Sequence, residues 1–400
     1  MSAPEHVLVV GAGLGGLRTV EQLRQAGYEG RISLVGAELH PPYDRPPLSK
    51  QLLAGDWEPE RIALKEEAAL DDLGVRMYLG TRAVALRPGE VELSDGAVLA
   101  ADAIVLATGV EARRLPGQPP SVHTLRTLDD ALALRSELAE AKSLLVIGAG
   151  FIGAEVASTA LGRGVAVTVL EAAPVPLARA LGEQVGQMCA RLLREGGVDL
   201  RTDVTLAGFA ETPNGVAVKL ADGSLLEADV VVVGIGGRPD LGWLSDTGLD
   251  LVDGVPCDES GRVVGLENVW AVGDMASWAD GSGGRHRHEH WTSTSDQATI
   301  VARSITGTEP PAPTVPYFWS DQFGLKIQLI GRPEHADAIV PLRGEGLAGG
   351  PIKGTVVGYL QQDRLVAVAG FGAARYVVRF RAPLLEGVGK DAALAFAASL

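Results

Sequence analysis

The stretch VLVVGAGLGGL, residues 7–17, recurs 137 residues later as LLVIGAGFIGA, residues 144–154. Each copy begins with a short apolar run, typical of a buried strand, and continues into three glycines spaced G-x-G-x-x-G. A helical stretch follows, to about Ala26 in the first copy and about Leu161 in the second. A second apolar strand then leads to an acid, Glu38 or Glu171. Two copies of one strand–turn–helix–strand unit predict two similar α/β domains.

The glycine spacing predicts what these units bind. The first glycine allows a tight turn, the second lets the backbone approach a pyrophosphate, and the third lets helix and strand pack closely. The pyrophosphate then meets free N–H groups at the helix N-terminus, and the acid accepts hydrogen bonds from ribose hydroxyls. Two such units in one chain indicate FAD together with a nicotinamide nucleotide. Two further short strands, IVLATG (104–109) and WAVGD (270–274), are interpreted as the chain leaving the first unit and returning to it.

Length and charge exclude some classes of function. A chain of 400 residues is long enough for two to four domains. Its net charge of −15 argues against a nucleic-acid-binding protein, which needs a basic surface. Residues 311–400 nevertheless carry nine Lys/Arg against seven Asp/Glu. This basic tail is either ordinary variation between solvated faces or part of a surface that docks an acidic partner.

Cysteine content and hydropathy favour a cytoplasmic protein without a membrane segment. The two cysteines, Cys189 and Cys257, form no C-x-x-C motif, which excludes a disulfide framework and a dithiol redox pair of that type. The N-terminal MSAPEHVLVVGAG has no basic region typical of a signal peptide. No apolar run approaches the roughly 20 residues of a membrane helix.

Eight motifs together resemble one known family, the FAD-dependent NADH:ferredoxin reductases that serve cytochrome P450 and Rieske oxygenase systems. The resemblance covers nearly the whole chain in the family's order. In chain order the motifs are GAGLGGL (11–17), PYDRPPLSK (42–50), LATG (106–109), GAGFIGAE (148–155), GIGGRP (234–239), AVGD (271–274), EHW (289–291) and YFWSDQFGLKIQ (317–328).

The resemblance implies an α/β fold of glutathione reductase type. It has two Rossmann-like dinucleotide-binding domains, for FAD and NAD, and a smaller C-terminal α/β domain. We expect the FAD domain at residues 1–112 and again at 242–314, the NAD domain at 113–241, and the C-terminal domain at 315–400. FAD is expected to be bound noncovalently and NADH to be the electron donor.

The same resemblance implies a set of FAD-binding residues. Asp274 would bind the ribityl-phosphate side and Glu38 the adenosine ribose, although the family often has an acid where this chain has Ala37. Out of context, the prolines of PPYDRPPLSK (41–50) favour a stiff surface loop or a polyproline ligand. The order and spacing shared with the family instead imply that Arg45, Pro46 and Lys50 lie against the isoalloxazine of FAD. The expected FAD-binding residues are Gly11, Gly13, Leu14, Gly15, Gly16, Glu38, Arg45, Pro46, Lys50, Ala83, Ala107, Thr108, Gly109, Arg126, Gly273, Asp274, Glu289, His290 and Trp291.

Around NADH, Glu155 would hold the nicotinamide carboxamide. A carboxylate at Glu171 would repel the 2′-phosphate of NADPH, which predicts a preference for NADH. Lys50, Glu155 and Trp319 are the expected catalytic residues: Lys50 would stabilise reduced flavin, and Trp319 would pack near the flavin unless it is an ordinary core aromatic. The expected NAD-binding residues are Gly148, Gly150, Phe151, Ile152, Gly153, Glu155, Glu171, Gly234, Ile235 and Gly236.

Several functions stay open at this point. A flavin disulfide reductase or NADH oxidase would need a reactive cysteine beside the flavin, and residues 40–50 contain none. The sequence is also compatible with a rubredoxin reductase, or with a sensor flavoprotein that resembles apoptosis-inducing factor and switches partner binding with NADH. The expected partner is a ferredoxin with a 2Fe-2S or 3Fe-4S cluster and, through it, a P450 or Rieske oxygenase. The sequence leaves the ferredoxin, the oxygenase and the oligomeric state undetermined.

The stretch RHRHEHW, residues 285–291, places histidines at every second position, 286, 288 and 290. On a strand they would share one face, as the ligands of a zinc ion would. Since no cluster of carboxylates or thiols accompanies them, we expect no metal. We interpret Arg285–His288 as the end of a loop, and Glu289, His290 and Trp291 as the part near the flavin.

Overall fold

The structure is a computed structural model that describes residues 4–212, 215–280 and 283–400. The chain forms two compact units, and it passes between them several times. The first consists of Met1–Asp44, Glu60–Glu111 and Gly237–Thr314; the second consists of Arg45–Pro59, Ala112–Gly236 and Val315–Leu400. Each unit is described by itself below.

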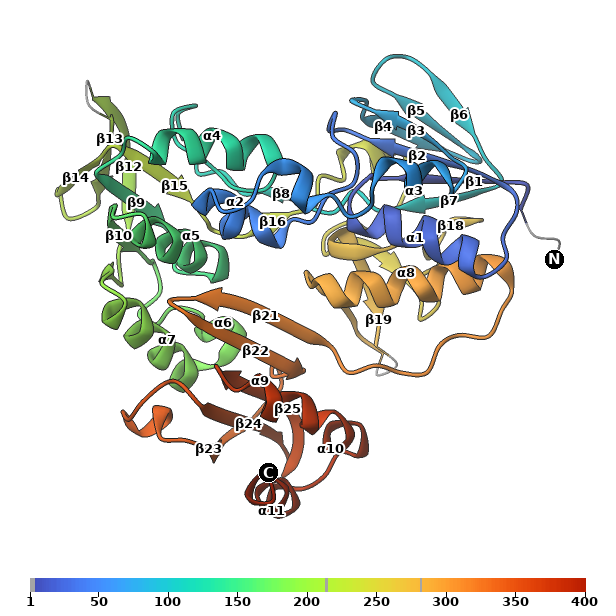
Figure 1. Cartoon of the computed structure of the whole chain (residues 1–400). Helices are drawn as coiled ribbons and strands as arrows, with labels where there is room; N and C mark the ends of the chain where they lie inside the picture. The colour runs from blue at the N-terminus through green and yellow to red at the C-terminus, as the bar shows by residue number, and fades with distance from the viewer. Residues whose placement is uncertain (1–3, 213–214, 281–282) are drawn as a thin grey trace. The chain divides into compact units, whose positions relative to one another are not determined.

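The first unit is built on a five-stranded parallel sheet. Its central strands are buried on both faces, as their continuous Val, Ile and Leu runs predict. Helices α1 (Leu14–Gln25) and α8 (Trp291–Thr306) pack side by side (Figure 1). In sheet order the strands are β18 (Val269–Ala271), β7 (Ala103–Leu106), β1 (His6–Val10), β2 (Arg31–Gly36) and β3 (Val75–Leu79).

Two small sheets complete this unit. One is antiparallel, with β4 (Ala83–Arg87), β5 (Glu90–Leu93) and β6 (Val98–Ala100). The other joins β17 (Val255–Cys257), β19 (Ala276–Ala279) and β20 (Arg285–Arg287). The last strand corrects one expectation: Arg285–Arg287 is not a loop, because it pairs antiparallel with β19.

The second unit repeats the parallel arrangement. Strand β9 (Ser143–Ile147) lies between β10 (Ala166–Leu170) and β15 (Val230–Val233), and β11 (Asp199–Arg201) forms the edge. Helix α5 (Phe151–Gly162) connects β9 to β10, as the second glycine motif predicts. The other elements around this sheet are α4 (Leu128–Leu138), α6 (Ala178–Leu181), α7 (Glu183–Glu195), and the antiparallel strands β12 (Leu206–Thr212), β13 (Gly215–Leu220) and β14 (Leu225–Ala228).

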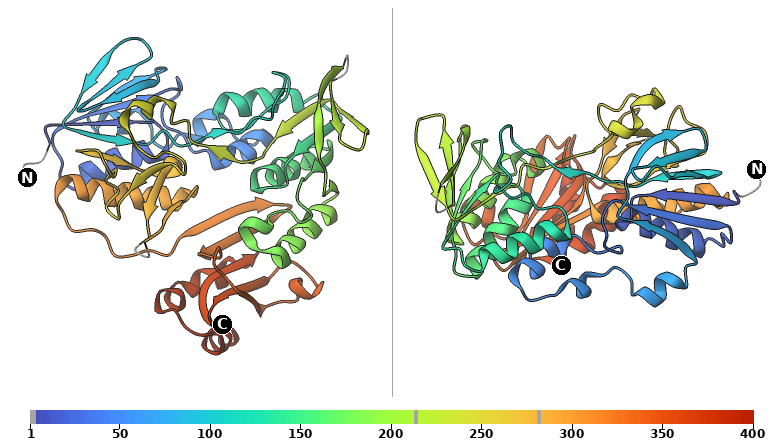
Figure 2. Two further views of the ribbon diagram at one scale, coloured as in Figure 1. Left: turned by 180° about the vertical axis from the view of Figure 1, so that it is seen from behind. Right: turned by 90° about the horizontal axis from the view of Figure 1, so that it is seen from above.

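The C-terminal part of the second unit is a five-stranded antiparallel sheet with short helices, which Figure 2 shows from two further directions. Its strands in sheet order are β21 (Tyr317–Gln322), β22 (Leu325–Gly331), β25 (Arg364–Phe371), β24 (Thr355–Gln361) and β23 (Ala338–Arg343). Its helices are α9 (Ala374–Val377), η6 (Val378–Phe380), α10 (Arg381–Glu386) and α11 (Lys390–Ala398).

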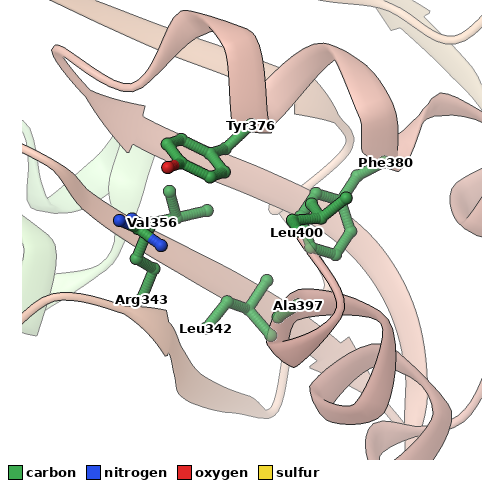
Figure 3. Close-up of a pocket in the computed structure, with 7 residues that line it drawn as sticks. All are labelled: Leu342, Arg343, Val356, Tyr376, Phe380, Ala397 and Leu400. Atoms are coloured by element: carbon green, nitrogen blue, oxygen red, sulfur yellow. The ribbon is translucent and has the colours of Figure 1, made fainter.

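A small pocket lies in this C-terminal part, where Tyr376 faces Arg343 above a mainly apolar floor (Figure 3). The Arg343 guanidinium lies 4.1 Å from the centre of the Tyr376 ring. None of the site residues that the sequence predicts lines this pocket. Among the helices that the structure describes, none is long and apolar enough to cross a membrane.

Candidate functional site

The first glycine turn lies at the point where the strand order of the first sheet reverses, between β1 and β7. Gly11 has a φ of +120°, and a Cβ there would overlap the carbonyl oxygen of Ala107. A Cβ on Gly16 would overlap the carbonyl oxygen of Gly11. At Gly13, in contrast, no heavy atom lies within 4 Å of the position of a Cβ, and helix α1 begins there without a side-chain cap. This combination leaves room beside the start of a helix whose first N–H groups have no side-chain cap, which fits the pyrophosphate of a dinucleotide.

The ends of β7 and β18 border the same turn. Ala107, Thr108 and Gly109 follow β7, and Gly273 and Asp274 follow β18. The N–H of Gly273 donates to Gln297 Oε1 at 2.7 Å, and the carbonyl of Asp274 accepts from Arg287 Nη1 at 2.6 Å. The side chain of Asp274 thus lies on a fixed backbone next to the glycine turn.

Glu38 occupies the place expected of the ribose-binding acid. It follows β2 by two residues, is half-buried, and accepts a hydrogen bond of 2.5 Å from the hydroxyl of Tyr43. Ala37, where the family often has an acid, is exposed. The geometry is that of an acid held at the carboxyl end of an inner strand by a neighbouring tyrosine.

The EHW motif lies at the start of α8. Trp291 is the first residue of that helix, and its indole N–H donates to Asp44 Oδ1 at 2.8 Å. The guanidinium of Arg18, on α1, lies 5.5 Å from the centre of a Trp291 ring. Trp291 therefore links PYD (42–44) to α1 and α8 of the first unit.

The rings of the three histidines form a row, although only His286 lies on a strand. The ring centres of His286 and His288 are 6.3 Å apart, and those of His288 and His290 are 6.2 Å apart. His286 Nε2 lies 2.7 Å from Asp280 Oδ2. Within the described ranges, no group of three His, Cys, Asp or Glu residues is arranged to hold a metal ion.

The second glycine turn has the same backbone geometry. Gly148 has a φ of +103° and its Cβ would crowd the carbonyl of Gly234, while a Cβ on Gly153 would overlap the carbonyl oxygen of Gly148. The nearest atom to a Cβ on Gly150 is 3.9 Å away. Helix α5 begins at the next residue, again without a side-chain cap. This turn also fits a pyrophosphate.

Glu171 and two exposed isoleucines surround the second turn. The Glu171 carboxylate accepts hydrogen bonds from the backbone N–H groups of Ala149, at 2.7 Å, and Ala173, at 2.9 Å. Ile152 and Ile235 are 45% and 36% exposed. Exposed apolar side chains beside a glycine turn suit the rings of a nucleotide better than they suit water.

Lys50 and Glu155, two of the expected catalytic residues, form a buried ion pair. Lys50 Nζ lies 2.7 Å from Glu155 Oε2, and the side chains are only 12% and 3% exposed. The hydroxyl of Ser49 donates to the same oxygen at 2.5 Å, and the hydroxyl of Ser320 donates to Oε1 at 2.6 Å. Glu155 lies on α5, five residues after Gly150. Glu155 therefore brings the pair to the helix that begins at the second glycine turn.

The segment that carries Lys50 is not a surface loop. Pro46–Ser49 form a 3-10 helix, and Pro47, Leu48 and Ser49 are buried. Arg163, on the loop after α5, donates to the carbonyls of Leu53 and Ala54, and the hydroxyl of Thr159, on α5, donates to the carbonyl of Ser49, so hydrogen bonds hold the segment against α5.

Four further predicted residues lie elsewhere. Arg45 donates to the carbonyl of Arg126, which brings these two together. Trp319 is half-buried on β21 and stacks against Tyr317 at 5.9 Å, and Ala83 begins β4 of the first unit.

The contacts that sequence reasoning missed are those of Ser49 and Ser320 with Glu155. A single serine beside a lysine or in a strand gives no signal of its own.

Comparisons with known proteins agree with this geometry. Residues 5–298 match the family model of pyridine nucleotide-disulphide oxidoreductases, and residues 317–399 match the reductase C-terminal domain. The ferredoxin–NAD(+) reductase subunit of the benzene 1,2-dioxygenase system of Pseudomonas putida is 39% identical over 332 residues, or 82% of this chain and 80% of that one. A rubredoxin–NAD(+) reductase of Pseudomonas putida is 35% identical over 368 residues, or 90% and 94%.

A solved structure extends the likeness to the whole fold. The crystal structure of a covalent putidaredoxin reductase–putidaredoxin complex matches with a TM-score of 0.93 at 32% identity, over 100% of this chain and 99% of that one. The fold expected from the motifs, with two Rossmann-like domains and a C-terminal sheet domain, is thereby confirmed. The chain belongs to the pyridine nucleotide-disulphide oxidoreductase family, among the ferredoxin–NAD(+) reductases that carry the reductase C-terminal domain.

Proposed function

We infer that this protein is an FAD-dependent ferredoxin reductase that takes electrons from NADH and passes them singly to an iron–sulfur ferredoxin of a P450 or Rieske oxygenase system. The observation that carries this inference is the pair of glycine turns, one with an ion pair of Lys50 and Glu155 on its helix. FAD, when bound, accepts the hydride and releases single electrons. The names of the relatives support the same reaction.

We propose roles for the chain's own residues in this reaction. The turn at Gly11–Gly16, with Asp274 and Glu38, binds FAD, and the turn at Gly148–Gly153, with Glu171, binds NADH. Glu155 accepts a hydrogen bond from the nicotinamide carboxamide, and Lys50 balances its charge and stabilises the negative charge of reduced flavin. Trp319 and the remaining predicted cofactor residues, from Arg45 and Pro46 to Ala83 and Arg126, stay predictions, as do the domain boundaries at residues 112, 241 and 314.

The two cysteines argue against a thiol mechanism. Cys189 and Cys257 are both free and buried. Burial raises the pKa of each thiol to about 12, so neither is a thiolate at neutral pH. A flavin disulfide reductase needs a thiolate nucleophile. A rubredoxin reductase remains a second candidate, because one relative carries that name.

The decisive experiment starts with anaerobic reduction of the flavoprotein by NADH. The reduced protein is then mixed with a panel of ferredoxins, a rubredoxin and a disulfide, and reoxidation is followed by the flavin absorbance. We expect rapid reoxidation by a ferredoxin and none by the disulfide. Faster reoxidation by rubredoxin would select the second candidate. A reduced complex that persists with every acceptor would indicate a sensor instead of a reductase.

We also propose that the C-terminal part contributes to ferredoxin docking. Arg375, Arg379 and Arg381 are exposed on α9, η6 and α10, in the basic tail of an otherwise acidic chain. Attraction between opposite charges accelerates transient association and weakens with salt.

We expect Arg379→Glu with Arg381→Glu to lower kcat/KM for ferredoxin about tenfold at low salt, with less effect at high salt. The matched control is Arg87→Glu, an exposed arginine of the first unit that pairs with Glu92. Ferredoxin reduction that does not slow with ionic strength would refute this docking surface.

A cytoplasmic location is likewise a proposal, which fractionation of the producing cells tests directly.

A further inference from the structure

The carboxylate of Glu155 receives donors from two distant parts of the chain. Ser49 and Lys50 donate to Oε2, and Ser320, on the first strand of the C-terminal sheet, donates to Oε1. Glu155 and Ser320 are 165 residues apart in sequence. A carboxylate offers about four acceptor positions. Three are filled here, which leaves one on Oε1 for a ligand.

The direction of the Ser320 hydrogen bond is set by a second residue. Gln322 Nε2 donates to Ser320 Oγ at 2.9 Å. Because a hydroxyl has a single hydrogen, a Ser320 oxygen that accepts from Gln322 is free to direct its own hydrogen to Glu155. Ser320 and Gln322 are 0% and 2% exposed, so water does not compete for either contact.

The strand geometry makes this arrangement specific. Side chains alternate along β21, so Phe318, Ser320 and Gln322 lie on one face, and Trp319 points to the other. On the first face, Phe318 packs against Phe151, the first residue of α5, at a ring-centre distance of 4.4 Å. Phe323 N–H donates to Ser158, also on α5, at 2.8 Å. Contacts on either side of Ser320 therefore fix the strand along the helix that carries Glu155.

We propose that Ser320 and Gln322 are positioning residues for Glu155: they orient its Oε1 so that the remaining acceptor position receives the nicotinamide carboxamide. The inference rests on the proposed role of Glu155, and it adds two residues of the C-terminal sheet that the glycine motifs do not indicate. On this proposal the C-terminal sheet helps to bind NADH, in addition to any role in ferredoxin docking.

The test measures two quantities on the purified flavoprotein: the dissociation constant of NAD(+), by titration without turnover, and the rate constant of flavin reduction by NADH. We expect Ser320→Ala to weaken NAD(+) binding and slow reduction by about tenfold each, which corresponds to about 1.4 kcal/mol per effect. Ser320→Thr keeps the hydroxyl, and we expect it to restore both values to within about threefold of the parent, a difference below 1 kcal/mol.

Gln322→Leu provides a second route that leaves Ser320 in place. We expect a smaller loss than for Ser320→Ala, and the double variant should be no worse than Ser320→Ala alone, because Gln322 acts through Ser320. The control is Thr355→Val, which removes a buried hydroxyl of the same sheet that bonds only to backbone groups. It should leave both quantities unchanged.

Glu155→Gln separates the two proposals. If this variant binds and oxidises NADH normally, the proposed role of Glu155 is wrong. If Glu155→Gln is impaired but Ser320→Ala and Gln322→Leu match the parent, only the positioning inference is wrong. Equal losses in Thr355→Val, or no rescue by Ser320→Thr, would also overturn it, since the effect would then be a general loss of packing.

Discussion

The two glycine turns of this protein, Gly11–Gly16 and Gly148–Gly153, share one backbone and differ in what their helices carry. In both, the first glycine has a positive φ and faces a carbonyl of the adjacent strand end, and the third faces the carbonyl of the first. In neither turn does a heavy atom lie closer than 3.9 Å to the position of a Cβ on the middle glycine. The shared part is what any dinucleotide pyrophosphate requires.

The differences begin at the helix. Arg18 of α1 and Glu155 of α5 occupy equivalent positions, since each lies two residues after the third glycine. Arg18 is 28% exposed and pairs with Glu21 at 2.6 Å, whereas Glu155 is 3% exposed and pairs with Lys50. The fifth position of the motif also differs: a Cβ on Gly15 would press on Thr294 and Val272, and Ile152 in the second copy is 45% exposed. The two turns thus share their backbone geometry, and they differ in the side chains on the first turn of the helix that follows.

The largest effect should come from filling the open positions. Gly13 and Gly150 have extended backbone angles that other residues adopt, and a side chain there meets little of the protein. We expect Gly13→Val to fold but to be purified without flavin. Gly150→Val should keep its flavin and bind NADH at least about tenfold more weakly. Flavin absorbance measures the flavin content of each variant, and NAD(+) titration measures its nucleotide affinity. A Gly13→Val protein with full flavin content would show that the two turns do not bind dinucleotides in the same way.

The next largest effect should be the difference in stability between the ion pairs of the two helices. Lys50→Met leaves the buried Glu155 charge without its partner, and we expect a loss of about 3 kcal/mol in unfolding free energy. Lys65 pairs with Glu21 on α1 at 2.9 Å, where the side chains are 26% and 16% exposed. Lys65→Met should cost less than about 1 kcal/mol. Urea unfolding of the two flavoproteins tests this, and equal losses would show that burial does not distinguish the pairs.

A smaller effect should come from Glu38 and Glu171, the acids that follow β2 and β10. We expect them to differ in their effect on the choice between NADH and NADPH. Glu171→Ala removes the carboxylate that disfavours a 2′-phosphate, so the NADH to NADPH ratio of kcat/KM should fall by about tenfold or more. Glu38→Ala should leave that ratio unchanged and weaken flavin retention. An unchanged ratio in Glu171→Ala would remove its proposed role.

The smallest effect is expected at the histidine row, which has no counterpart in the second unit. His286 is 40% exposed and pairs with Asp280, which is 10% exposed. We expect His286→Ala and His288→Ala to change stability by less than about 0.5 kcal/mol and to leave flavin content and ferricyanide reduction intact. Loss of flavin in either variant would show that these histidines contribute to flavin binding in the first unit.

The sequence predicted those features that depend on neighbours along the chain. The glycine turns, the strands beside them and the helices α1 and α5 follow from local spacing. Lys50 and Glu155 were identified separately through a family resemblance, but their contact depends on how residues 45–59 fold against α5. Ser320 and Gln322 were missed because polar residues on a buried strand face look like any others in an alternating pattern. The loop expected at Arg285–His288 was wrong for Arg285–Arg287, because these residues pair antiparallel with β19.

The division of the chain has a practical consequence for building chimaeras. Residues 45–59 and 315–400 belong to the same compact unit as 112–236, although the sequence places the first of them inside the FAD-binding stretch. A chimaera that took only residues 112–236 from a relative would take its Glu155 without Ser49, Lys50, Ser320 or Gln322. Its carboxylate would then meet donors that evolved for another protein. A graft intended to transfer coenzyme preference should carry all three segments, with junctions near residues 44, 59, 111, 236 and 314.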